Sequence, residues 1–174
     1  RDRIGWIGTG VMGAPMCAHL MGAGHEVHVY TRTKSKASRL IDQGAHWCES
    51  PGDAAHNADF VFTMVGYPAD VEEVYFSRRG ILENAGRGAV LVDMTTSQPS
   101  LAGRISEAAR GRGCCSLDAP VSGGDVGARQ ATLAIMVGGD PGVFEKTLPL
   151  LETLGKTISL MGGPGAGQHT KMAN

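Results

Sequence analysis

The sequence predicts an α/β protein with a doubly wound, mostly parallel sheet and helices on both faces. Two observations predict it: short apolar runs alternate with amphipathic or alanine-rich segments along the whole chain, and glycine or proline residues separate the two kinds of segment. The 174 residues amount to one domain of ordinary size. With 42% hydrophobic and 19% charged residues, the chain does not belong to the disordered class.

Strands are expected where apolar, β-branched or aromatic residues form short runs. They are Ile4–Ile7, Val27–Tyr30, His46–Cys48, Phe60–Val65, Ala89–Asp93, Cys115–Ala119, Leu133–Val137 and Thr157–Leu160. Helices are expected between them, several with proline in the first turn or glycine after the last. They are a helix ending near Gly22, Ser35–Gln43, a short helix opened by Ser50, Ala69–Tyr75, Pro99–Arg110 and Asp140–Leu154. This alternation is typical of crossover units that stack into a parallel sheet.

Composition and spacing exclude several functional classes. The net charge of -1 argues against a nucleic-acid partner bound through overall charge, and no apolar run approaches the roughly 18 to 20 residues of a membrane helix. The four cysteines form no Cys-x-x-Cys pair, and reduced thiols are typical of the cytoplasm. The six histidines show no metal-ligand spacing. We therefore expect a cytoplasmic protein without a metal site, a nucleic-acid partner or a membrane segment.

The first predicted strand runs directly into the sequence GTGVMG, residues 8–13. In the G-x-G-x-x-G pattern between a strand and a helix, Gly8 makes the tight turn, Gly10 lets the backbone approach a pyrophosphate, and Gly13 lets the helix pack on the strand. The N–H groups at the helix start then bind phosphate. The expected cofactor contacts are Gly8, Gly10, Val11, Met12 and Gly13. The alternative is a glycine turn without a ligand.

The residues after the second predicted strand indicate which dinucleotide is bound. Sites that prefer NAD usually carry Asp or Glu there for the ribose diol, whereas this chain has no carboxylate between Tyr30 and Asp42. It has cations and hydroxyl groups instead, and a guanidinium binds a phosphate through two parallel hydrogen bonds. The expected contacts to a 2′-phosphate are Thr31, Arg32, Thr33 and Lys36. The sequence therefore predicts NADP, with NAD as the alternative; the competing interpretation is a solvated basic helix face.

Two further segments carry polar groups suited to a substrate. The sequence DAPVSGG, residues 118–124, lies at the end of a predicted strand, and its consecutive glycines leave N–H groups open to a carboxylate or carbonyl oxygen. In GAGQHTKMAN, residues 165–174, Lys171 and Asn174 are three apart and share one helix face. By themselves the first segment could equally be a turn and the second a solvated surface helix.

Together, GTGVMG, DAPVSGG and G-x-G-x-x-x-K-x-x-N in this order resemble the β-hydroxyacid dehydrogenase family over the whole chain. The resemblance implies a Rossmann-like NAD(P)-binding domain of an oxidoreductase. Such an enzyme transfers a hydride between NADP(H) and a small 3-hydroxy acid or its semialdehyde. It also implies the domain organisation: residues 1–163 bind the dinucleotide, and residues 164–174 form a glycine-rich hinge and the start of an interdomain helix. The family's C-terminal helical domain is expected to be absent from this chain, and the full-length protein to be a homo-oligomer.

The resemblance also assigns roles to individual residues. Lys171 matches the catalytic acid/base, and Asn174 matches the asparagine three residues after it. The substrate loop of the family corresponds to Ser122, Gly123 and Gly124. The stretches that pass the nicotinamide cofactor correspond to Met64, Val65 and Thr96. One departure is Ala131, where relatives often carry glycine in a turn.

Two other functions stay open from the sequence. A non-catalytic dinucleotide-binding module that serves protein interactions is the main alternative, although it should have lost Lys171 and the SGG loop. An imine reductase is less favoured because those relatives generally lack the lysine. Specificity for 6-phosphogluconate is also less favoured, because relatives of that type carry histidine where this chain has Asn174.

Overall fold

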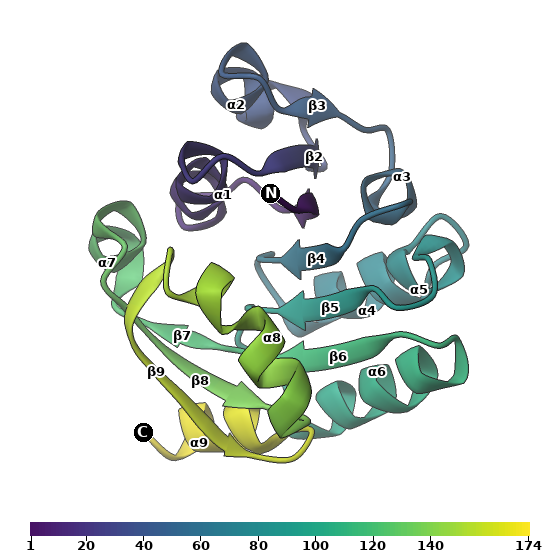
Figure 1. Ribbon diagram of the computed structural model, residues 1–174, viewed down its shortest axis with the longest axis vertical. Helices are drawn as coiled ribbons and strands as arrows, with labels where there is room; N and C mark the ends of the chain where they lie inside the picture. The colour runs from purple at the N-terminus through teal and green to yellow at the C-terminus, as the bar shows by residue number, and fades with distance from the viewer.

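The computed structural model describes residues 1–174 and contains one sheet of nine strands with helices on both faces (Figure 1). The strands are β1 (Arg3–Ile7), β2 (Glu26–Tyr30), β3 (His46–Trp47), β4 (Phe60–Thr63), β5 (Val90–Asp93), β6 (Cys115–Asp118), β7 (Val121–Ser122), β8 (Leu133–Gly138) and β9 (Gly155–Gly162). Their order is β3-β2-β1-β4-β5-β6-β8-β7, and β9 pairs with β8. The predicted doubly wound, mostly parallel sheet is confirmed.

The first six strands are parallel, so their carboxyl ends meet at one edge of the sheet. Ile7 at the end of β1 is in register with Tyr30 of β2 and Thr63 of β4. The reversal of chain order at β1 is the point where ligands bind in open α/β sheets. The glycine turn that follows β1 therefore opens at the switch point of the sheet.

The far end of the sheet contains antiparallel pairs. Asp118 of β6 pairs with Gly138, and Val121 of β7 pairs with Ile135, so β7 continues β6 along the same partner strand. Pro120 lies in the short break between β6 and β7. The short return from Ser122 to β8 leaves no room for the long crossover that a parallel pair needs, so β8 runs antiparallel.

The helices cover two separate apolar cores, one on each face of the sheet. They are α1 (Gly13–Gly22), a 3₁₀ turn (Lys34–Ala37), α2 (Ser38–Asp42), α3 (Pro51–Ala55), α4 (Pro68–Phe76), α5 (Ile81–Asn84), α6 (Pro99–Gly111), α7 (Gly124–Gln130), α8 (Pro141–Leu151) and α9 (Ala166–Ala173). On one face, α1, α7 and α8 pack on the sheet, and on the other α3 to α6 do (Figure 1). No helix has both the length and the apolar character needed to span a membrane.

Helix starts follow the predicted capping chemistry. The Ser50 hydroxyl accepts a hydrogen bond from the Asp53 N–H at 3.0 Å, and the Asp140 carboxylate accepts one from the Val143 N–H at 3.1 Å. In both helices proline occupies the first turn, where its missing N–H costs nothing. Each cap satisfies an N–H group that the helix itself leaves without a partner.

Several element predictions were incomplete. The helix expected over Ser35–Gln43 is a 3₁₀ turn followed by the short α2. Three elements were not predicted from the sequence: α5, α7 and β7. The helix α7 was missed because it begins in consecutive glycines, Gly123 and Gly124, with φ angles of 131° and 60°. Such residues predict a turn rather than a helix start.

Candidate functional site

A pocket of about 720 Å³ opens at the carboxyl ends of β1, β2 and β4. It brings together residues that the sequence analysis assigned to the cofactor from three separate segments. These residues are Gly8, Gly10, Val11, Met12, Thr31, Arg32, Thr33, Lys36, Met64 and Val65. The predicted cofactor residues that do not line this pocket are Gly13 and Thr96.

The three glycines of the turn meet different surroundings. Gly8 has a φ of 105°, and a Cβ there would overlap the carbonyl of Met64. A Cβ at Gly13 would overlap the carbonyl of Gly8, whereas a Cβ at Gly10 would meet no atom within 4 Å. The first and third glycines are therefore required by the packing of the chain. The second glycine, Gly10, borders open space in the pocket, which a phosphate group of a ligand can fill.

Unpartnered polar groups line the turn. No side chain caps the start of α1. The Ala14 N–H donates to the Gly10 carbonyl at 3.1 Å and Pro15 has no N–H, so the N–H groups left for a ligand are those of residues 10–13. The Thr9 hydroxyl oxygen is buried without a hydrogen-bond partner and lines the pocket. The Trp6 indole N–H donates to the Gly8 carbonyl at 2.7 Å and so fixes the start of the turn. These features fit a ligand that carries a diphosphate.

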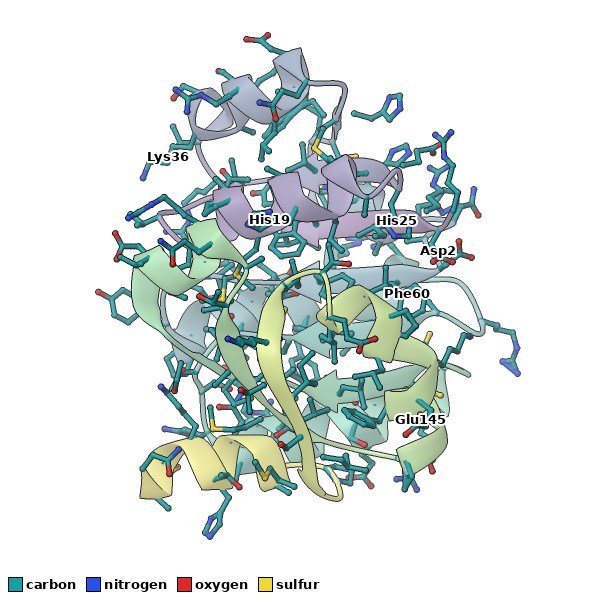
Figure 2. All side chains as sticks on the ribbon, turned by 60° about the vertical axis from the view of Figure 1, so that its left-hand side comes forward. Asp2, His19, His25, Lys36, Phe60 and Glu145 are labelled. Atoms are coloured by element: carbon teal, nitrogen blue, oxygen red, sulfur yellow. The ribbon has the colours of Figure 1, made fainter.

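Opposite charges meet at the rim of the pocket. The Arg32 guanidinium, which is largely exposed, donates to the Asp70 carboxylate at 2.8 Å. This hydrogen bond and ion pair raise the pKa of Arg32. The same carboxylate accepts the Tyr67 N–H at 3.1 Å and so caps α4. Lys36 also lines the pocket, and its exposed side chain extends outward into solvent (Figure 2).

The second and third motifs meet at Lys171. Its ammonium group, on α9, donates to the Ser122 hydroxyl at 2.7 Å, across 49 residues of sequence. Lys171 is half-buried, and the neighbouring Gly123 and Gly124 are exposed. The side-chain amide nitrogen of Asn174 lies 3.6 Å from the sulfur of Met136 and forms no hydrogen bond with Lys171 or Ser122, so its predicted substrate role stays a prediction.

Asp118 anchors the helix that carries Lys171. Its two carboxylate oxygens accept the N–H groups of Gly165 and Gln168, each at 2.9 Å. Burial raises the pKa of this carboxyl, while the backbone donors act in the opposite direction. A Cβ at Gly167 would overlap the carbonyl of Met136, so glycine lets α9 approach the sheet. Asp118 belongs to the motif DAPVSGG, but no role for it was predicted from the sequence; a carboxylate at the end of a strand was the available signal.

The segment Thr95–Ser97, after β5, connects the pocket with the lysine region. The Thr95 N–H donates to the Asp93 carboxylate at 3.0 Å, and the Thr95 hydroxyl accepts the N–H of Val65, a pocket residue, also at 3.0 Å. Burial raises the pKa of the Asp93 carboxyl to about 7. Thr96 is exposed between its two buried neighbours. This segment thus contacts the pocket residue Val65 through Thr95, the residue that precedes Thr96.

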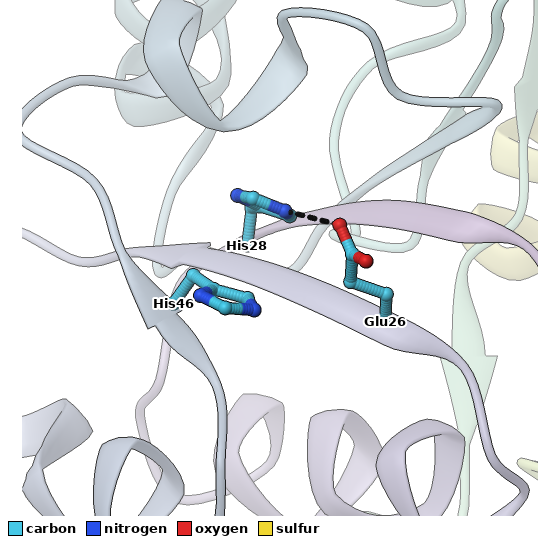
Figure 3. A group of neighbouring side chains, drawn as sticks. All are labelled: Glu26, His28 and His46. Carbon is cyan, nitrogen blue, oxygen red and sulfur yellow. Dashed lines mark hydrogen bonds and ion pairs between the residues drawn. The ribbon is translucent and has the colours of Figure 1, made fainter.

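One cluster of potential metal ligands lies away from these motifs, on β2 and β3 (Figure 3). His28 and His46 are in register on the two parallel strands and their rings stack at 4.7 Å, while a ring nitrogen of His28 hydrogen-bonds the Glu26 carboxylate at 2.7 Å. The guanidinium groups of Arg1 and Arg3 lie 3.5 and 3.7 Å from that carboxylate. A divalent cation would face both positive charges, and we assign no metal to this cluster.

Comparison with known proteins gives consistent matches along the chain. Residues 3–163 match the family model described as the NAD binding domain of 6-phosphogluconate dehydrogenase. The chain is 55% identical to the uncharacterized oxidoreductase YkwC of Bacillus subtilis (strain 168), over 100% of the chain and 60% of that protein. It is 44% identical to the 2-hydroxy-3-oxopropionate reductase of Escherichia coli (strain K12), over 99% of the chain and 59% of that protein.

The same relationship holds among solved structures. The 3-hydroxyisobutyrate dehydrogenase of Mycobacterium tuberculosis, solved with L-serine, superposes with a TM-score of 0.94 at 37% identity. The match covers 99% of this chain and 58% of that one. The chain thus spans about three fifths of the length of the relatives described here.

Proposed function

The chain belongs to the β-hydroxyacid dehydrogenase family, as an NAD-binding domain of the 6-phosphogluconate dehydrogenase type, and on that premise we propose its specific reaction. The full-length protein transfers a hydride between NADP(H) and a small 3-hydroxy acid or its semialdehyde. Lys171 is the general acid/base. The observation that carries this proposal is the 2.7 Å contact between the Lys171 ammonium and the Ser122 hydroxyl, which joins the two substrate motifs.

The pocket at β1 supports the dinucleotide part of the proposal. The N–H groups of the turn and the space beside Gly10 receive the diphosphate, as the positive end of α1 favours. Met64 and Val65 line the wall toward the nicotinamide. When bound, the cofactor supplies or accepts a hydride at C4 of its nicotinamide ring.

Lys171 handles the proton of the reaction. During reduction of an aldehyde, the ammonium group stabilises the developing alkoxide and gives it a proton; during oxidation, the neutral amine accepts the hydroxyl proton. Ser122 holds the lysine Nζ in place and offers a hydroxyl to the substrate. The exposed N–H groups of Gly123 and Gly124 bind the substrate carboxylate.

The preference for NADP rests on the end of β2. Arg32 lines the pocket, and no carboxylate stands in that segment to bind a ribose diol. A 2′-phosphate takes the place of Asp70 as the partner of the Arg32 guanidinium. Thr31 and Thr33 add hydroxyl groups at the same rim.

The domain division is part of the same proposal. Residues 1–163 bind the dinucleotide, and residues 164–174 form the link to a helical domain in the full-length protein. The family model ends at residue 163, just before α9 begins at Ala166, which supports a boundary there.

The test is steady-state kinetics of the full-length protein in both directions: reduction of 2-hydroxy-3-oxopropionate with NADPH, and oxidation of 3-hydroxyisobutyrate or L-serine with NADP⁺. We expect turnover with at least one of them, and Lys171→Ala should lower kcat by at least about 100-fold, the lower range for a positioned acid/base. The affinity for NADPH should stay within about threefold, because Lys171 lies outside the cofactor pocket. Lys156→Ala, at an exposed lysine of β9, is the matched control.

Two outcomes would contradict the proposal. Unchanged kcat in Lys171→Ala would remove the acid/base role. Tight NADPH binding without turnover of any hydroxy acid or semialdehyde would favour the non-catalytic binding module instead.

A further inference from the structure

The side chain of Gln168 is fully buried although it is polar. Its amide nitrogen donates to the Thr95 carbonyl at 2.8 Å, and its amide oxygen accepts the Ser97 N–H at 2.8 Å. The partners are 73 and 71 residues away in the sequence. One neutral amide therefore holds the backbone on both sides of Thr96.

The backbone of Gln168 is fixed as well. Its N–H donates to the Asp118 carboxylate, so the residue is tied to β6 by its main chain and to the Thr95–Ser97 segment by its side chain. Lys171 follows three residues later on α9, which places it about one turn along the helix. A shift of the Gln168 side chain thus moves the Thr95–Ser97 segment relative to the lysine.

The same segment reaches the cofactor pocket through a second contact. The Thr95 hydroxyl accepts the N–H of Val65, which lines the pocket. One connected series of hydrogen bonds therefore runs from the pocket wall to the helix of Lys171, through Val65, Thr95 and Gln168 of α9. Buried polar contacts of this kind define geometry because their loss leaves unsatisfied groups.

We propose that Gln168 is a positioning residue that sets the distance and orientation between the nicotinamide-facing segment Thr95–Ser97 and the Lys171 ammonium. The inference rests on the proposed function, since it gives Gln168 a role only where hydride and proton transfer are coupled. The phosphate-binding turn lies on other strands, at β1, β2 and β4, and makes no use of the Gln168 amide. Substitution of Gln168 therefore slows the chemical step and leaves cofactor affinity nearly unchanged.

A residue that only filled the core would give a different result. Its substitution would lower the free energy of unfolding, while the folded enzyme would transfer hydride at the wild-type rate. The decisive readout is therefore the rate of NADPH oxidation in a single turnover, measured by stopped flow on full-length protein that is folded by circular dichroism.

Two substitutions separate the hydrogen bonds from the volume of the side chain. Gln168→Met has similar length and no hydrogen-bonding amide, and it should lower the single-turnover rate at least tenfold with the KM for NADPH within about threefold. Gln168→Glu places a carboxylate oxygen opposite the Thr95 carbonyl, where only the protonated acid can donate. Its rate relative to wild type should therefore rise as the pH falls from 8 to 5.

The control is His169→Gln, an exposed position next to Gln168 on α9, which should keep the wild-type rate. The wild-type single-turnover rate in folded Gln168→Met protein, or in folded Gln168→Glu protein at pH 8, would overturn the positioning role, as would an equal loss of cofactor affinity. If Lys171→Ala is inactive while these variants are fully active, only the positioning role fails. If Lys171→Ala is itself fully active, both the proposed function and this inference fail.

Discussion

The glycine turn and the lysine region form their geometry in different ways. In the glycine turn, Gly8 and Gly13 lie within one strand–helix unit and pack against each other, and Gly8 also contacts the β4 end, at Met64. In the lysine region, Ser122, Asp118 and the Thr95–Ser97 segment lie between 47 and 73 residues from their partners on or beside α9. The turn is therefore specified locally, whereas the lysine region depends on the completed sheet.

The largest expected effect is on the pH dependence of the free energy of unfolding. It comes from Asp93, which supports the lysine region by accepting the Thr95 N–H. Burial raises the pKa of its carboxyl from 3.8 to about 7 in the folded protein. The folded state then holds a proton that the unfolded state has released, so the stabilising contribution is complete below pH 3.8 and is lost as the pH rises through about 7. Between pH 5 and pH 8 the free energy of unfolding should fall by about 3 kcal/mol, because a shift of one pKa unit corresponds to about 1.4 kcal/mol.

Asp93→Asn should remove this decline, because asparagine keeps the oxygen that accepts the Thr95 N–H and does not titrate. Urea unfolding of both proteins at pH 5 and pH 8 measures the difference. Contributions from groups that do not interact with Asp93 cancel between the two proteins, whereas the nearby charge of Asp118 is itself one cause of the raised pKa of Asp93. Equal pH dependence in wild type and variant would show that Asp93 is ionised in the folded state.

The next largest effect distinguishes a glycine that the packing of the turn requires, Gly13, from a glycine that borders the space for the ligand, Gly10. Gly13→Ala should destabilise the fold by about 1 to 3 kcal/mol, because its Cβ overlaps the Gly8 carbonyl. Gly10→Ala should change the unfolding free energy by less than about 0.5 kcal/mol and weaken NADPH binding at least tenfold, because its Cβ enters open pocket space. Urea unfolding and fluorescence titration with NADPH measure the two quantities. A Gly10→Ala protein that binds NADPH normally would place the diphosphate elsewhere.

A smaller effect is expected at the rim of the pocket. Arg32→Ala should weaken NADPH binding by about 10-fold or somewhat more, as expected for the loss of a charged hydrogen bond, while NADH binding stays the same. Titration of both cofactors against both proteins gives the comparison. If wild type prefers NADH, or if both cofactors weaken equally, Arg32 does not bind a 2′-phosphate.

The smallest effect concerns Ala131, which ends α7 in the left-handed conformation, with φ 57° and ψ 40°. An alanine Cβ is unfavourable there, whereas glycine adopts this conformation readily. Ala131→Gly should therefore raise the free energy of unfolding by about 1 kcal/mol in urea titrations. A destabilised Ala131→Gly protein would mean that the greater freedom of glycine in the unfolded chain outweighs the relief of strain.

The sequence predicted the features that depend on local pattern. The alternation of strands and helices, the cap at Ser50 and the turn after β1 all appear as expected, because each is determined within a few neighbouring residues. The departure noted at Ala131 also lies at a strained turn, which its position in the family pattern indicated.

The sequence did not predict features that arise only when distant segments meet. The antiparallel pairing of β7 and β8 depends on the short return through α7, whose glycines predict a turn. The anchor at Asp118 and the buried amide of Gln168 become visible only once β6, α9 and the Thr95–Ser97 segment are in contact. The stacking of His28 on His46 likewise depends on the register of two parallel strands.

The central claim is that a dinucleotide held by the turn between β1 and α1 presents its nicotinamide to the Lys171 ammonium. The most direct measurement is a crystal structure of the full-length protein with NADP⁺ bound. We predict the diphosphate against the N–H groups of residues 10–13, the 2′-phosphate at Arg32, and the nicotinamide beside Thr96 with Lys171 facing the same space. A diphosphate bound away from the glycine turn, or a nicotinamide turned away from Lys171, would contradict the account.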